Sequence, residues 1–250
     1  MSNDLVYVLS KIQLGDITHS KFKDSSDAVK EALRKKYPSF GNQNEIRVVD
    51  IEMGPQGQKV QEKLIPMIVL TSAVKDWGIR ISPDSIILHT NNYSNFDEFK
   101  ERMEHVLEVV ASAMDVAFTS FIGIRYINKI KPDADGGFPT FIRSEFLQPE
   151  LSGLQKAGAN LGAKYQTPDG WVNVNSGVTV NSGKLSRDLL EVATDLGETD
   201  VALEGPWAHL DVDSVFLPPN LLEYNKEEIM DKLTALRSHA KNIYGQIIHA

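Results

Sequence analysis

The residues best suited to chemistry in this chain alternate along one short segment near residue 210. His209, Asp211 and Asp213 are separated by single residues, and in a strand such residues point to the same face of the sheet. An imidazole and two carboxylates are suitable ligand types for zinc or another divalent ion. Residues two apart on a strand lie roughly 6.5–7 Å from each other, so one ion could take two of the three. His209 and Asp211 are therefore weak metal candidates, and a metal-dependent enzyme is one hypothesis.

An ion pair is the alternative interpretation of these carboxylates. Arg125 falls within another expected strand, residues 119–130, and an aspartate opposite an arginine is favourable on a solvated sheet face. We expect Asp211 or Asp213 to pair with Arg125 in this way. This interpretation requires no metal, and no cofactor is predicted.

The strand around Arg125 carries further candidates for binding a ligand or a partner. Alternation predicts that Arg125 and Lys129 face one way, whereas Tyr126 and Asn128 face the other. A guanidinium can bind a small anion through two hydrogen bonds. A buried Asn128 would instead tie its strand to a neighbouring backbone. Arg125, Tyr126 and Asn128 are kept as binding candidates, with both interpretations open.

Other signatures of catalysis or of cofactor binding are missing from the sequence. Asp133, Asp135 and Gly136 resemble the start of a calcium-binding loop, but Ser144 stands where that loop requires glutamate. There is no P-loop, dinucleotide-binding glycine pattern or hydrolase nucleophile motif. Because the chain has no cysteine, disulfides and thiol chemistry are excluded. These absences favour a protein that is not an enzyme.

Composition narrows the class of protein further. A chain of 250 residues with 42% hydrophobic and 24% charged residues is typical of a soluble globular protein. The net charge of −8 argues against general nucleic-acid or anionic-membrane binding, which requires a surplus of lysine and arginine. The sequence has no secretory signal pattern and no apolar run that could span a membrane. We therefore expect a cytoplasmic protein.

The elements that position these residues follow a similar order in both halves of the chain. In the first half we expect strands and helices over residues 5–14, 25–37, 46–53, 64–74, 77–81, 86–93 and 96–110. In the second half we expect them over residues 119–130, 140–155, 163–166, 171–180, 189–194 and 207–215, with a last helix after Asn225. Each half then reads β-α-β-β-β-β-α. The prediction is an α+β fold with two tandem halves, residues 1–116 and 117–250.

The last helix of each half carries an apolar stripe that must be buried against a sheet. Two halves side by side would form one antiparallel sheet with all helices on one face, and the other face would be concave and open. This arrangement resembles the fold of the TATA-box-binding protein in topology alone. A DNA-bending saddle needs basic residues and apolar wedges, and this acidic chain offers no such surplus.

Several motifs also resemble a known family. They are the strand Gly123-Ile124-Arg125-Tyr126-Ile127-Asn128-Lys129-Ile130, residues 82–85 and 90–93, and Leu210-Asp211-Val212-Asp213. In order and over nearly the full length they are similar to a sporadically distributed, functionally uncharacterised bacterial family with a Gly-Leu-Arg-Tyr-Ile-Asn-Arg-Ile strand and a late Leu-Asp-Ile-Asp strand. Ile124 and Lys129 replace the usual leucine and arginine. The resemblance implies a bacterial or phage origin and a defence-linked, antitoxin-like setting, and it assigns no catalytic residue.

The leading hypothesis is therefore a non-enzymatic protein-binding or regulatory protein, with another protein or a second copy of the chain on the open sheet face or in a groove between the halves. The aromatic residues Trp77, Tyr93, Trp171 and Trp207 would suit such a surface. The alternative is a small apolar ligand in a cavity between helix and sheet. The cavity would be lined by Phe96, Phe99, Met103, Tyr126, Ile229 and Leu233, unless these side chains close-pack as core.

Overall fold

The computed structural model describes residues 4–41, 45–54, 57–132, 137–138, 142–149, 151–154 and 157–248. Asp133, Asp135 and Gly136, which resemble a calcium loop in sequence, lie outside the described residues. The fold is α+β, with a 10-stranded sheet in which every described pairing is antiparallel. The predicted fold class and the antiparallel sheet are confirmed.

The first part of the chain supplies one side of this sheet. Its elements are β1 (Leu5–Leu14), α1 (His19–Leu33), β2 (Ser39–Phe40), β3 (Glu45–Gly54), β4 (Gly57–Pro66), β5 (Ile68–Thr71), β6 (Trp77–Ser82), β7 (Ser85–Thr90) and α2 (Phe96–Met114). Side chains cap the two helices at their N-terminal ends, where the first backbone N–H groups have no helical partner. Thr18 accepts from the backbone N–H of Lys21, and Asn95 accepts from that of Glu98.

The second part of the chain supplies the other side of the sheet. Two of the elements predicted there are wrong. Its elements are β8 (Phe118–Ile130), η1 (Ser144–Phe146), β9 (Leu161–Thr167), β10 (Gly170–Val180), α3 (Arg187–Ala193), η2 (Thr194–Leu196), β11 (Pro206–Phe216), β12 (Leu222–Glu223) and α4 (Lys226–Ile247). Where a helix was expected over residues 140–155, the described residues form the single turn η1. Where a strand was expected over residues 189–194, α3 and η2 form, and Leu189 and Ala193, four residues apart in α3, are buried on one face of the helix. The prediction of two repeated halves is therefore not confirmed.

The sheet order is β2-β5-β6-β7-β1-β8-β11-β10-β9, with β12 pairing to β8. β1 and β8 form the central pair, in which Val8 lies opposite Tyr126 and Ser10 opposite Ile124. From β1 the order runs outward through β7, β6, β5 and β2, and from β8 through β11, β10 and β9. The first strands of the two parts thus join them into one continuous sheet.

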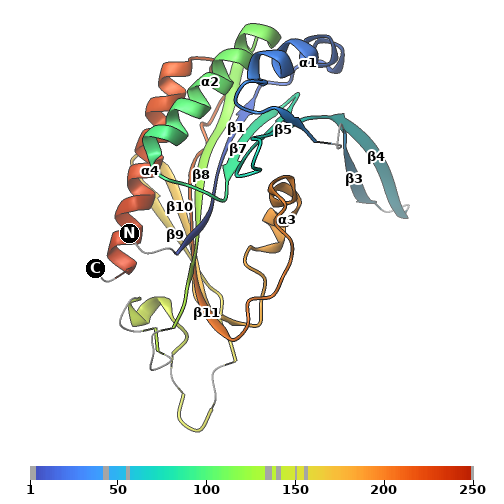
Figure 1. Ribbon diagram of the computed structural model, residues 1–250. Helices are drawn as coiled ribbons and strands as arrows, with labels where there is room; N and C mark the ends of the chain where they lie inside the picture. Colours follow the sequence, from blue (N-terminus) through green and yellow to red (C-terminus); the bar gives the residue numbers. More distant parts are fainter. Residues whose placement is uncertain are drawn as a thin grey trace.

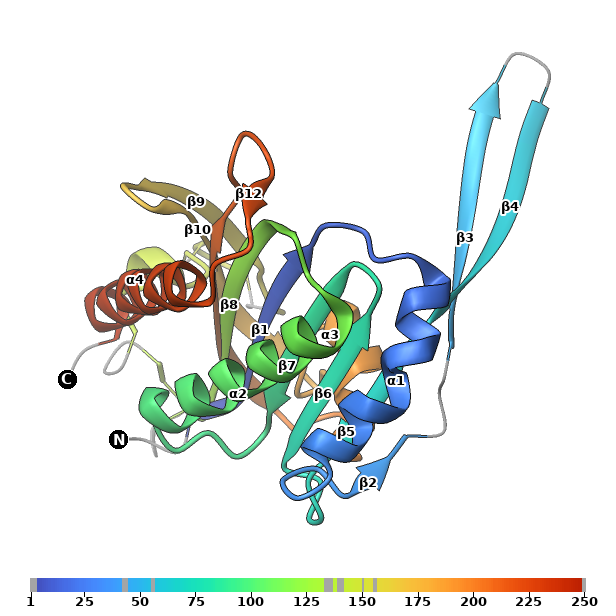
Figure 2. The same ribbon diagram turned by 90° about the horizontal axis from the view of Figure 1, so that it is seen from above.

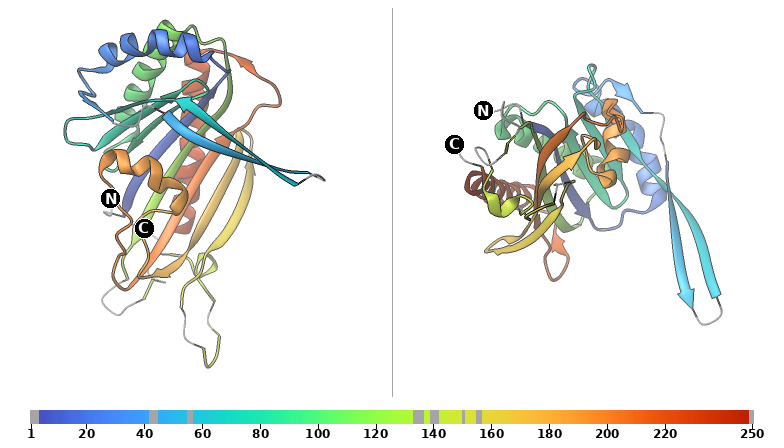
Figure 3. Two further views of the ribbon diagram at one scale, coloured as in Figure 1. Left: turned by 90° about the vertical axis from the view of Figure 1, so that its right-hand side faces the viewer. Right: turned by 90° about the horizontal axis from the view of Figure 1, so that it is seen from below.

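β3 and β4 do not belong to this sheet, although a single meander was expected there. Within the described residues they pair only with each other, from Glu45 opposite Pro66 to Gly54 opposite Gly57. The hairpin projects away from the body of the protein (Figures 2 and 3). It forms a separate two-stranded ribbon beside α1 and β5.

The long helices α1, α2 and α4 cover one face of the sheet, and the short α3 lies on the other (Figure 1). The main core forms where α2 and α4 meet the sheet, and it includes Phe96, Phe99, Met103, Ile229 and Leu233, with Tyr126 packed against it. These are the side chains expected to line a ligand cavity, and the structure places them in the core. In the described part of the chain, no helix has both the length and the apolar character needed to cross a membrane.

Candidate functional site

The sheet face opposite α1, α2 and α4, which we call the open face, is partly covered. The chain between β10 and β11 crosses it as α3 and η2, a stretch we call the α3–η2 segment (residues 183–200). Leu185, Leu189 and Leu196 pack there against Tyr7 and Ile127 of the sheet. The prediction that all helices lie on one face is therefore wrong for α3, which has an apolar side of its own to bury.

Arg80 of β6 holds one end of the α3–η2 segment. Its Nε and a terminal nitrogen donate to the two carboxylate oxygens of Asp195 at 2.6 and 3.0 Å, and its other terminal nitrogen donates to Glu191 at 2.8 Å. Arg80 is 4% exposed and the Asp195 side chain 8%. Burial alone would raise the pKa of Asp195, but the nearby His89 ring and the hydrogen bonds from Arg80 bring it below its ordinary value. This buried bidentate pair anchors the segment.

His89 and Tyr7 extend this network beneath Asp195. The Tyr7 hydroxyl lies 2.7 Å from His89 Nδ1, and His89 Nε2 lies 3.5 Å from an Asp195 oxygen. Burial raises the pKa of Tyr7 and lowers that of His89, so both groups are neutral at pH 7. The order tyrosine, histidine, aspartate resembles a proton relay. Both rings are almost completely buried, so the network lies away from solvent.

Arg125 of β8 holds the other end of the segment. Its Nε and a terminal nitrogen donate to the two oxygens of Asp211 at 2.9 and 2.6 Å. Its remaining terminal nitrogen donates to Asp188 of α3 at 2.6 Å. The predicted pairing of Arg125 with an aspartate of the late strand is thus present. The partner is Asp211, which is diagonal to Arg125 in the ladder, while Asp213 lies directly opposite.

Asp213 and His209 occupy the same face but make other contacts. Asp213 accepts from the Asn173 amide at 3.3 Å, and burial raises the pKa of its carboxyl. His209 lies opposite Lys129, and burial followed by that positive charge lowers the pKa of its imidazole to about 4. Among the residues that the structure describes, no three histidine, aspartate or glutamate side chains are grouped so that they could hold a metal ion.

The lowered pKa of His209 predicts a loss of stability in mild acid. In the unfolded chain the His209 imidazole has an ordinary pKa near 6.5, whereas in the folded protein it stays unprotonated down to about pH 4. Stability should therefore fall as the pH drops from 6.5 towards 4, and His209 should contribute about 1–3 kcal/mol of that fall. Urea unfolding of wild type and His209→Asn at pH 7 and pH 5 measures the difference.

His89 contributes to the same loss of stability at low pH, because burial also lowers its pKa. The His209→Asn variant should therefore show a shallower dependence on pH, with some slope remaining. His19→Asn is the matched control, since His19 is exposed at the start of α1. Parallel curves for wild type and His209→Asn would contradict the assignment.

The remaining predicted site residues are not grouped with Arg125. Asn128 faces the helices and donates to the Leu210 carbonyl at 3.0 Å, as its backbone-tying interpretation predicts. Tyr126 faces the same way. Trp77, 3% exposed, packs in the core, and Trp207 lies at the start of β11, where its ring N–H donates to the Glu204 carbonyl. None of Trp77, Tyr126 and Asn128 is available to a partner on the open face.

Sequence reasoning missed Arg80, His89 and Asp195. One signal was present, because Arg80 is the single charge in the otherwise apolar or small Trp77–Ser82 run. A buried arginine requires an anionic partner, which predicts a carboxylate at this position of the fold. The sequence does not say which carboxylate supplies it.

Neither a scan against protein-family models nor a search of curated proteins finds a match to this chain.

Proposed function

We propose that this protein is a non-enzymatic protein-binding or regulatory protein whose open face takes an acidic segment of another polypeptide. The observation that supports this proposal is the α3–η2 segment itself. Its carboxylates are bound by two arginines of the sheet, Arg80 and Arg125. The chain thus displays, within one molecule, the kind of acidic segment that this face recognises.

The two arginines differ in how easily a partner could reach them. The Arg80–Asp195 pair is almost completely buried, so it fixes the segment in place. At Arg125 the bound Asp188 side chain is 61% exposed, whereas Asp211 is 9% exposed. A partner carboxylate can replace Asp188 while the buried Asp211 pair stays intact. Exchange of one carboxylate for another conserves the charge-assisted hydrogen bond, so the exchange itself costs little.

A protein suits this face better than a small anion does. In the ladder Trp171 pairs with Val215, and Asn173, two residues later, pairs with Asp213. Asp213 in turn lies opposite Arg125, so Trp171 is on the same face of the sheet as Arg125. Trp171 is 37% exposed, and the Lys164 ammonium lies 4.5 Å from its ring. Tryptophan and arginine are the residues that most often dominate binding energy at protein interfaces. Trp171 and Arg125 together therefore offer an anchor and a charge to one partner.

The expected result is a complex that depends on Arg125. Wild-type protein purified gently from its own host should carry a second protein in native mass spectrometry. Arg125→Gln should lose it, with affinity reduced at least about tenfold, because the variant keeps polar bulk but removes the charge. Reconstitution with the identified partner and titration calorimetry give that ratio.

Arg34→Gln is the matched control, because Arg34 is an exposed arginine at the C-terminal end of α1 that pairs with the neighbouring Glu31. It should bind as wild type does. A bare monomer from the host, or a partner that Arg125→Gln retains at full affinity, would remove the proposal.

The strand order of the sheet also bears on how the chain arose. We infer that the two parts of the chain arose by duplication, and the support is the mirrored strand order outward from β1 and β8.

The family resemblance of the Gly123–Ile130 strand supports a defence-linked, antitoxin-like setting. Identification of the partner tests that setting directly, since an antitoxin-like protein would co-purify with a toxic enzyme. No grouping of side chains in the described residues favours a metal-dependent enzyme.

A further inference from the structure

A second surface lies along β9, at the edge of the sheet. Among the residues that the structure describes, this strand ends the sheet and pairs only with β10. Residues 162–166 of β9 are exposed on both faces, and Tyr165 is 42% exposed. Within the described part of the chain, no strand lies along the outer edge of β9, so this edge presents backbone N–H and C=O groups without a strand partner. Such an edge is a template for another extended chain.

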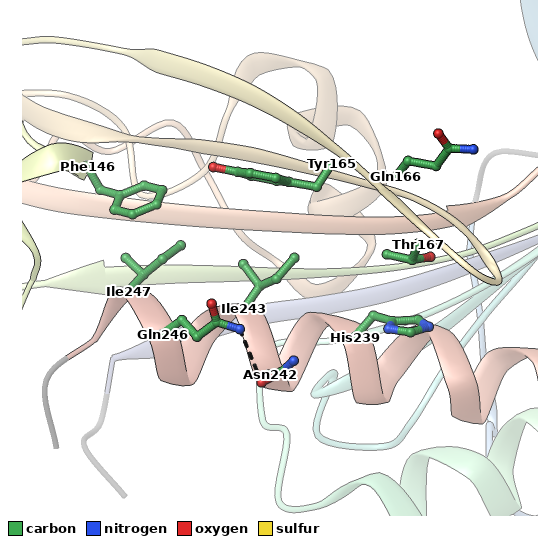
Figure 4. Close-up of a pocket in the computed structure, with 9 residues that line it drawn as sticks. All are labelled: Phe146, Tyr165, Gln166, Thr167, His239, Asn242, Ile243, Gln246 and Ile247. Atoms are coloured by element: carbon green, nitrogen blue, oxygen red, sulfur yellow. Dashed lines mark hydrogen bonds between the residues drawn. The ribbon is translucent and has the colours of Figure 1, made fainter.

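A groove runs beside this edge, between β9 and the C-terminal half of α4 (Figure 4). Its volume is about 260 Å³, which accommodates one large side chain. Tyr165, Ile243, Ile247 and Phe146 supply its apolar lining. The Thr167 hydroxyl, also in the lining, is buried and makes no hydrogen bond within the described part of the chain.

The edge and the groove together point to one kind of occupant. We propose that an extended segment of a partner protein adds to β9 as a further strand and inserts an apolar side chain into the groove under α4. A small apolar molecule would fill the groove but leave the strand edge unpaired. A polypeptide satisfies both, because its backbone completes the ladder and its alternate side chains point into the groove.

Charge favours a foreign segment over a second copy of this chain. Lys164 is the central residue of Leu161–Thr167, so symmetric pairing of two β9 strands would place two lysines opposite each other, which is destabilising. An acidic residue opposite Lys164 is favourable for the same reason. The segment that fits therefore alternates apolar residues facing the groove with acidic residues on the Lys164 side.

The test uses the full-length protein and peptides selected from a phage-displayed random library. The recovered peptides should alternate apolar and acidic residues. Asn242→Trp, which fills the groove from an exposed position of α4, should weaken the best synthetic peptide at least about tenfold. Lys241→Trp is the matched control, since Lys241 is exposed next to Asn242 but does not line the groove, and it should bind normally. Thermal unfolding verifies that both variants fold.

A second arm separates strand addition from simple apolar contact. The same peptide, N-methylated at every second residue on the edge that faces β9, should lose binding, because its N–H donors to the ladder are gone. Methylation on the opposite edge should leave binding unchanged. The inference is overturned if selection yields no peptide, if Asn242→Trp binds as wild type does, or if both methylated peptides bind equally well. A protein that is a dimer through β9 would also overturn it.

Discussion

Replacing Arg80 with alanine is expected to lower the free energy of unfolding by about 3–5 kcal/mol, because it leaves a buried carboxylate without its partner. Asp195 is held by two nitrogens of Arg80, and both side chains are nearly inaccessible to water. Glu191, the third member, is exposed and can return to solvent. Urea unfolding followed by tryptophan fluorescence measures the loss.

Two variants show whether the loss comes from the stranded charge. Arg80→Leu combined with Asp195→Leu removes both charges, and it should recover most of the stability, since apolar replacement of a buried pair is often neutral. Arg34→Ala, at an exposed pair, should stay within about 0.5 kcal/mol of wild type. A double variant as unstable as Arg80→Ala would mean that lost packing, and not an unpaired charge, is the cause.

The second large effect is expected at Gly78, which lies opposite His89 in the ladder. A Cβ at this position would stand 2.3 Å from His89 Nε2, in a site where the ring is completely buried and bonded to Tyr7. Gly78→Ala must therefore displace the imidazole. We expect a loss of about 1–3 kcal/mol, the usual cost of overpacking a core, measured by urea unfolding.

Gly245 supplies a control, because replacing it with alanine is expected to raise the stability of the protein. It lies within α4, and a Cβ there would meet nothing within 4 Å. Gly245→Ala should raise stability by about 0.5–1 kcal/mol, because alanine is the better helix former. If Gly78→Ala is as stable as wild type, the His89 ring has room that the structure does not show.

The strands at the centre of the sheet could be predicted because their apolar residues are continuous or alternate strictly. This pattern predicts β1, β6, β7, β8, β10 and β11, and the apolar stripes of α2 and α4 predict the burial of these helices on the sheet. The helix α3 could not be recognised with the same signal. It has 7 residues, too few to show a period, and its stability comes from packing on Tyr7 and Ile127.

The candidate site was predictable where it depends on alternation and not where it depends on tertiary contact. Alternation placed Asp211 and Arg125 on strand faces that can meet, and they do. Nothing local indicates that Arg80 pairs with Asp195, 115 residues later in the chain. Trp77 shows a further limit. Alternation divides a strand into two faces but does not say which one the helices cover, so a core residue was expected on a binding surface.

The position of β1 at the middle of the sheet sets an order of events during synthesis. β1 can pair with β7 as soon as β7 has left the ribosome, but its other neighbour is β8, whose first residue follows the end of β1 by more than 100 positions. At ordinary elongation rates that interval is on the order of 10 s. During this time the nascent first half exposes a central strand edge. The chain therefore passes through a stage in which chaperone binding, or pairing between neighbouring nascent chains, competes with the arrival of β8.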